Sequence, residues 1–260
     1  MELVYIVEEI EGEHKIIGVA ERKLAEKANL RHLTTICVPF ICDDGQDDEG
    51  NSIKGNWIVH NRYHKQVAKG EKSPPEAYNL FGGHTNAETF AEIGTTISEA
   101  VLFEGVRKEL SEELFTKKKG AKSATAKLEV WEDGSPVEEG GKIATIDAAQ
   151  YHVPLFGVIP VGFTEYESGS NKEYSYVFAL PVPFEEYKNL VAADDYERDG
   201  EKHSICLPVT SYSETQLKKL HEMADPGEVE VCDAILRLLY APRNVATFSS
   251  LRSIITENLH

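Results

Sequence analysis

Residues 94–115, GTTISEAVLFEGVRKELSEELF, carry the clearest periodic pattern in the chain. Their apolar side chains recur at intervals of three, four and four residues, which is the period of a helix with one buried stripe. These side chains are Phe103, Val106, Leu110 and Leu114. The spacing predicts an amphipathic helix that packs against the protein on one side.

Three carboxylates gather on this predicted helix. At about 100° per residue, Glu109, Glu112 and Glu113 fall within an arc of about 100°. Like charges three or four residues apart destabilise a helix, and Lys108 alone does not balance three of them. Mg²⁺ would balance them, since it takes carboxylate oxygens and completes its shell with water and phosphate. The helix therefore predicts either a divalent-cation site or a solvated acidic face, which is the commoner meaning of such a triplet.

Two short motifs favour the cation site. Residues 108–113, KELSEE, resemble the core of the Nudix box, whose family pattern is G-x5-E-x7-R-E-U-x-E-E-x-G-U, with U a bulky aliphatic residue. Residues 79–84, NLFGGH, resemble the loop that opens the box in Nudix proteins related to isopentenyl diphosphate isomerase. The resemblance covers about residues 1–222. It implies an α/β fold, the Nudix α/β/α sandwich with a mixed β-sheet, an N-terminal β-hairpin and an extra C-terminal helix.

The chain departs from the family pattern at several positions. Lys108 replaces the arginine of the box and does not reproduce its bidentate fork. The distance from Gly83 to Lys108 is about eleven residues longer than in the pattern, so we expect an insertion after Gly83. Ala100 stands in the place of the first glutamate. Phe115 replaces a glycine, so we expect the helix to continue or to end without a left-handed cap.

The resemblance implies roles for the residues of the box. Glu109 and Glu113 would be the principal metal ligands, with Glu112 as a third ligand or one that acts through water. The Gly82 carbonyl would complete the site. Lys108 would orient Glu109 or a neighbouring carboxylate. Mg²⁺ is the expected cofactor, with Mn²⁺ as the alternative.

Further site residues lie outside the box. Residues 57–62, WIVHNR, resemble a family strand that ends in basic residues, which makes Arg62 and Lys65 candidates for substrate binding. Gly83 and His84 are candidates for the same role in the glycine-rich loop. Glu173, in the sequence Asn-Lys-Glu, is a catalytic candidate beside Glu112 and Glu113. The alternative for Glu173 is a carboxylate at a strand edge.

Composition excludes several classes of partner. The formal net charge of −17 argues against nonspecific binding to nucleic acid or to an anionic membrane, since both need a basic surface. A small anionic nucleotide or diphosphate substrate remains compatible with this charge if local cations and a metal invert the field. The sequence leaves a homodimer open.

The cysteines and the N-terminus indicate a cytoplasmic protein. Cys37, Cys42, Cys206 and Cys232 form no C-x-x-C pair, so we expect them to be reduced. The first ten residues, MELVYIVEEI, have no basic region of the kind that begins a signal peptide. No run of 18 apolar residues occurs in the sequence.

Periodicity and turn residues predict the other elements and a single main domain. We expect a hairpin at the N-terminus, further strands along the chain, and two late helices. The expected strands are 3–7, 14–20, 34–41, 57–62, 155–166, 173–182 and 205–209, and the expected late helices are 213–223 and 229–240. Residues 1–225 would form the domain, with insertions near 84–98 and 116–150. Residues 226–260 would be a helical extension packed on it.

The leading functional hypothesis is Mg²⁺-dependent hydrolysis of the diphosphate bond in a nucleoside diphosphate linked to another moiety. A second hypothesis is a catalytically weakened Nudix-fold module that binds nucleotide or regulates, suggested by Ala100, Lys108 and the inserted loop. A third is isopentenyl diphosphate isomerase. That enzyme needs a cysteine in the loop just before the glycine and histidine, where this chain has Gly82, and Cys37 and Cys42 lie on an earlier strand.

Substitution of Lys108 tests the register of the box. An arginine donates two parallel hydrogen bonds to a carboxylate, whereas a lysine is a mobile point charge. We expect Lys108→Arg to leave turnover unchanged or to raise it by about five- to tenfold. Lys108→Ala should be slower than both, because Glu109 then has no cation beside it except the metal. Hydrolysis by Lys108→Ala at the wild-type rate and saturating Mg²⁺ would contradict this register.

Overall fold

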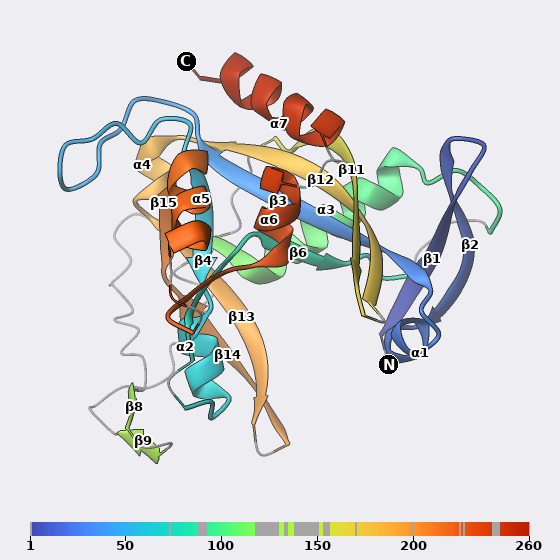
Figure 1. The fold of residues 1–260 in the computed structure, drawn as a ribbon, viewed down its shortest axis with the longest axis horizontal. Coiled ribbons are helices and arrows are strands. Elements are labelled where there is room, and N and C mark those ends of the chain that lie inside the picture. Colours follow the sequence, from blue (N-terminus) through green and yellow to red (C-terminus); the bar gives the residue numbers. More distant parts are fainter. Residues whose placement is uncertain are drawn as a thin grey trace.

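A mixed sheet of ten strands lies at the centre of the fold (Figure 1). In this computed structural model the main path of the sheet is β11 (Ile159–Ser168), β12 (Asn171–Val182), β3 (Arg31–Ile41), β4 (Trp57–Asn61), β5 (Glu76–Asn79) and β16 (Val229–Val231). Attached to this path are β1 (Leu3–Ile10), β2 (Glu13–Glu21), β6 (Phe81–His84) and β15 (Val209–Tyr212). The structure describes residues 2–72, 74–87, 93–117, 130–132, 135–137, 151–152, 157–169, 171–198, 200–223, 225, 227–240 and 245–259.

Two smaller sheets accompany the central one. The first is formed by β10 (Tyr151–His152), β7 (Leu114–Lys117), β13 (Leu190–Arg198) and β14 (Glu201–Leu207). The second pairs β8 (Val130–Glu132) with β9 (Ser135–Val137). Strand β7 begins at the residue that follows helix α3 (Glu99–Glu113). The first small sheet is therefore joined directly to the end of this helix.

Strand β3 lies in the middle of the main sheet, and both of its faces are covered. Its apolar side chains alternate, so that Leu33 and Cys37 belong to one buried cluster while Val38 and Phe40 belong to another. A strand buried on both faces reads as a continuous apolar run, as this one does. β3 pairs in parallel with β12 and antiparallel with β6, which brings the two glycines of β6 to the middle of the sheet.

Helices cover both faces of this sheet (Figure 1). Helix α3 (Glu99–Glu113) packs Leu102 and Val106 into the cluster that contains Leu33. Helices α5 (Glu214–Met223), α6 (Asp233–Tyr240) and α7 (Val245–Glu257) cover the opposite face. The short helices are α1 (Arg22–Lys27), α2 (Tyr63–Ala68) and α4 (Phe184–Tyr187). The predicted α/β class with a mixed sheet is confirmed.

Several local predictions are confirmed. The N-terminal hairpin forms as β1 and β2, and its turn uses positive φ angles at Glu11 and Gly12. Helix α5 begins with a capping box, in which Ser213 Oγ accepts from the Gln216 amide at 3.2 Å. Gln216 Oε1 in turn accepts from the Ser213 amide at 2.8 Å. Helix α3 ends without a left-handed cap, since Leu114 is extended and enters β7.

The prediction of one helix over residues 229–240 is wrong in its first part. Val229–Val231 is strand β16, parallel to β5, and the Cys232 amide donates to the Tyr78 carbonyl at 2.9 Å. The helix begins only at Asp233. A short run of two valines around one glutamate fits both the two-residue period of a strand and the 3.6-residue period of a helix. The segment forms a strand here because the edge of β5 is open for pairing. The segment predicted as a helical extension thus completes the main sheet.

Parts of the predicted insertions lie outside the described residues. These parts are 88–92 in the first insertion and most of 116–150 in the second. The strand predicted over 155–166 is described from Ile159 onward as β11. Within the described part of the chain, no helix has both the length and the apolar character that crossing a membrane requires.

Gly82 tests how tightly β6 is fixed against β3. Its φ is 142°, and an added Cβ would collide with the carbonyl oxygen of Thr35. We expect Gly82→Ala to lower the free energy of unfolding by about 3 kcal/mol or more. Gly94→Ala is the control, because Gly94 also has a positive φ but faces open space, and about 1 kcal/mol is expected there. Equal losses in urea denaturation would show that Gly82 is not packed against β3.

Candidate functional site

Helix α3 places two of its carboxylates against the glycines of β6. A methyl group on Gly83 would lie only 2.5 Å from Oε2 of Glu109, so a side chain at this position would displace the carboxylate. The Gly82 amide donates to Oε2 of Glu113 at 2.8 Å. Glu109 and Glu113 are one helical turn apart and therefore share a face of α3. The segment predicted as a glycine-rich loop is thus strand β6, and the structure brings its glycines together with the carboxylate helix.

The environment of these two carboxylates favours their protonated forms. Burial raises the pKa of Glu109 to about 7, although Lys108 opposes the shift. Burial also raises the pKa of Glu113 to about 8, opposed by the Gly82 amide and reinforced by Asp194 and Glu109. Burial disfavours the charged form of a carboxylate, so these two retain protons that a bound cation would have to replace. The pair is therefore suited to hold a divalent cation.

Lys108 and Glu112 lie beside this pair on the solvent side of α3. Lys108 Nζ is 3.7 Å from Oε1 of Glu109 and 3.8 Å from Oε1 of Glu112. The side chain of Glu112 is 57% exposed, compared with 11% for that of Glu109. The structure therefore separates Glu112 from Glu109 and Glu113, which are called the enclosed pair below. Lys108 is in position to orient Glu109.

Two basic residues predicted to bind substrate converge on one aspartate. Arg62, at the end of β4, contacts Oδ2 of Asp194 through Nη2 at 2.9 Å. Lys65, in α2, contacts Oδ1 of the same carboxylate at 2.5 Å. Strand β13, which carries Asp194, contacts helix α3, and Asp194 raises the pKa of Glu113 whereas Arg62 lowers it. Sequence reasoning missed Asp194, since nothing in the run LVAADD marks one acidic residue over another.

Glu173 lies on the other face of the sheet. Its Oε2 contacts Nη2 of Arg237 at 3.3 Å, and Arg237 belongs to α6, which covers the face opposite α3. Burial alone would raise the pKa of Glu173, but Arg237 and Asn171 together hold it below its ordinary value. The structure does not bring Glu173 to Glu109 and Glu113. Its surroundings are those of a buried ion pair.

His84 belongs to a separate group at the start of β3. Nε2 of His84 is 3.1 Å from Nε2 of His32, and one ligand atom each from Glu26, His32 and His84 lie within 4.8 Å of one another. Burial lowers the pKa of His84 to about 4, assisted by Arg22. Neutral imidazoles and a carboxylate are the ligands of a zinc-type ion, so these residues could hold a metal. The sequence did not indicate Glu26 or His32.

Cys37 lies under the enclosed pair. It pairs with Phe81 across β3 and β6, and its thiol is fully buried. Burial raises the pKa of this thiol well above its ordinary value, and Glu113 raises it further. A thiol in this state is neither accessible nor readily ionised. The described free cysteines also include Cys42 and Cys232.

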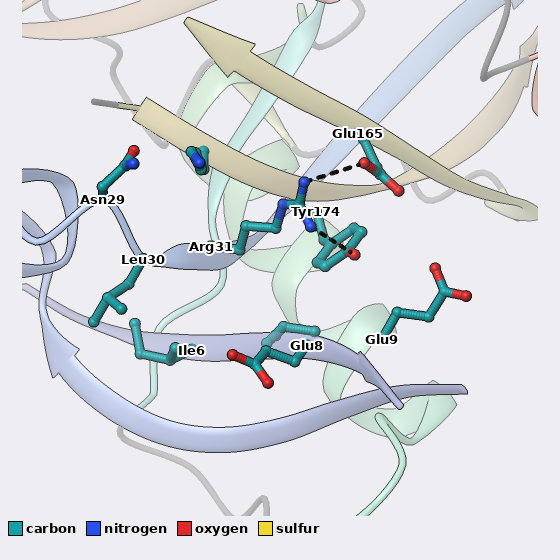
Figure 2. Close-up of a pocket in the computed structure, with 10 residues that line it drawn as sticks. Ile6, Glu8, Glu9, Asn29, Leu30, Arg31, Glu165 and Tyr174 are labelled. Atoms are coloured by element: carbon teal, nitrogen blue, oxygen red, sulfur yellow. Dashed lines mark hydrogen bonds and ion pairs between the residues drawn. The ribbon is translucent and has the colours of Figure 1, made fainter. Parts of the chain in front are cut away.

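A cleft of 630 Å³ opens between the N-terminal hairpin and the end of the main sheet (Figure 2). Arg31 crosses it towards Glu165, 3.5 Å away, and donates to the hydroxyl of Tyr174 at 3.2 Å. Glu8 and Glu9 line the cleft from β1. Neither Glu109 nor Glu113 lines this cleft.

No protein-family model matches the chain, and no curated protein matches its sequence.

The raised pKa values predict how metal affinity depends on pH. Without a cation, the two carboxyls contribute less to folded stability as pH rises from about 4.5 through about 8, because their folded pKa values lie above the unfolded one. A cation must displace those protons, so Mn²⁺ affinity should rise at least about a hundredfold between pH 6 and pH 9. Titration calorimetry measures this rise.

Glu113→Gln provides the control for this dependence. It should lower Mn²⁺ affinity at least about tenfold at high pH. It should also reduce the number of protons released on Mn²⁺ binding by about one, which makes the rise of affinity with pH less steep. Equal Mn²⁺ binding by wild type and Glu113→Gln would remove Glu113 from the site.

Proposed function

We propose that the protein is a Nudix-type hydrolase that uses Mg²⁺ to cleave the diphosphate bond of a nucleoside diphosphate linked to another moiety. The observation that carries this proposal is the enclosed pair, Glu109 and Glu113, seated against Gly82 and Gly83. The residues of the box resemblance and those of the glycine loop meet at this point. Helices on both faces of a mixed sheet support the Nudix sandwich as the fold.

The donor set fits a hard divalent cation. Glu109 and Glu113 would hold Mg²⁺, since both offer carboxylate oxygens and both have pKa values near neutrality, raised chiefly by burial. When bound, the ion supplies charge that neutralises phosphate and makes water a better nucleophile. Lys108 would orient Glu109 by its charge alone, from 3.7 Å away. A carbonyl ligand at Gly82 stays a prediction.

The remaining chemistry falls to nearby side chains. Arg62 and Lys65 would bind the phosphate that is turned away from the carboxylates. The proton of the attacking water needs a carboxylate acceptor whose pKa is close to the working pH. The exposed Glu112 and Glu113 itself are the candidates on α3, and the pKa of about 8 that burial gives Glu113 applies only without the cation. Glu173 is engaged with Arg237 and is not assigned this role.

A binding module without hydrolysis is the second candidate function. It is favoured by the single lysine contact to Glu109, where the family has an arginine, and by Ala100 in the place of a glutamate. The isomerase hypothesis has less support, because the thiol of Cys37 is fully buried.

A substrate screen tests the hydrolase proposal. The purified protein is incubated with nucleoside diphosphate sugars, dinucleoside polyphosphates, NADH and nucleoside triphosphates in Mg²⁺ or Mn²⁺, and nucleotide release is measured. With the best substrate, Glu109→Gln and Glu113→Gln should each lose about tenfold to a hundredfold or more of turnover, because each removes a charged ligand.

Glu104→Gln is the matched control for these variants. Glu104 lies on the same helix, its side chain is 63% exposed, and its partner is Arg107 at 3.5 Å. It should keep wild-type turnover. A nucleotide-dependent rise in melting temperature with no product over hours would instead support the binding module.

A further inference from the structure

We infer that Asp194 is a positioning residue that holds Arg62 and Lys65 together as the receptor for the substrate phosphate turned away from the carboxylates. This inference rests on the proposed function, because it assigns a part of the substrate to this cluster. Asp194 itself would not contact the substrate. Its role would be to hold the side chains of Arg62 and Lys65 in position and to keep Lys65 protonated.

The geometry of the cluster supports this role. Each oxygen of Asp194 takes one cation, Oδ2 that of Arg62 at 2.9 Å and Oδ1 that of Lys65 at 2.5 Å. The carboxylate therefore bridges the end of β4 to helix α2. Arg62 carries five N–H donors and Lys65 three, so most of their donors are not used by these two contacts. With two cations and one anion, the cluster keeps a charge of about +1.

Asp194 also links the cations to the carboxylate helix. Strand β13 pairs with β7, where Ala192 faces Leu114, the first residue after α3. This register carries Asp194 alongside the last turn of α3, where Glu113 lies. The influence of both Asp194 and Arg62 on the pKa of Glu113 agrees with this closeness. A diphosphate could therefore place one phosphate at the enclosed pair and the other at Arg62 and Lys65.

Burial explains why the cations need a carboxylate. The side chain of Lys65 is 9% exposed and that of Asp194 is 11% exposed. Burial lowers the pKa of Lys65, and the like charges of Arg62 and Lys69 lower it further, while Asp194 opposes both. A buried lysine without its counter-ion loses its proton readily. Removing the charge of Asp194 should therefore weaken phosphate binding most at high pH.

Binding of inorganic diphosphate in the presence of a metal chelator tests the inference. Titration calorimetry compares wild type with Asp194→Asn and Asp194→Glu at pH 6 and pH 9. We expect Asp194→Asn to lose at least about tenfold in affinity at pH 9 and clearly less at pH 6. Asp194→Glu, which keeps the charge, should recover most of the loss. Asp44→Asn is the control, because Asp44 also pairs with a lysine, Lys54 at 3.2 Å, but is exposed.

Two results would overturn the inference. One is a wild-type protein that does not bind diphosphate, and the other is an Asp194→Asn variant that binds it as tightly as wild type at pH 9. If Asp194→Asn does not fold, Arg62→Gln and Lys65→Gln decide the matter, since each should lose about tenfold in affinity. Because the chelated assay involves no hydrolysis, absence of hydrolysis in the substrate screen would count against the proposed function alone.

Discussion

The close approach of helix α3 to strands β3 and β6 is the constraint on which the rest of the site depends. Gly83 allows Glu109 to touch β6, and Gly82 offers its amide to Glu113. A third glycine, Gly105, faces the same strands, where an added Cβ would lie 2.8 Å from Oγ1 of Thr85. A side chain at Gly83 would displace the carboxylate of Glu109, and one at Gly82 would collide with the Thr35 carbonyl. Small residues thus create the electrostatics of the site.

This arrangement costs stability and gains reactivity. Burial raises the pKa values of the two carboxyls to about 7 and about 8, so folding shifts each of them towards its neutral form. Proteins tolerate such groups mostly where they function. By contrast, the ion pair of Glu173 and Arg237 is buried but matched, which is the pattern of a structural contact. The roles of these glutamates differ because their three-dimensional surroundings differ, and the sequence alone does not show those surroundings.

Local sequence predicted much of the fold but little about which elements meet. The period of α3, the N-terminal hairpin and the cap of α5 are short-range features, and each was predictable. Asp194 lies 132 positions from Arg62, and Ser175 in β12 lies 141 positions from Thr34 in β3. Periodicity tells which face of an element is buried, but not which distant element covers it. The contact of His32 with His84 was missed for the same reason.

The parallel pairing of β16 with β5 has a consequence for synthesis of the chain. While residues 229–240 are still inside the ribosome, β5 has an open edge, and the face that contains Val38 and Phe40 lacks the cover of α6. Open strand edges and uncovered apolar faces favour association with other chains. β5 therefore gains its second neighbour late, after the strands before it have been made, and the apolar face under α6 is covered at the same stage.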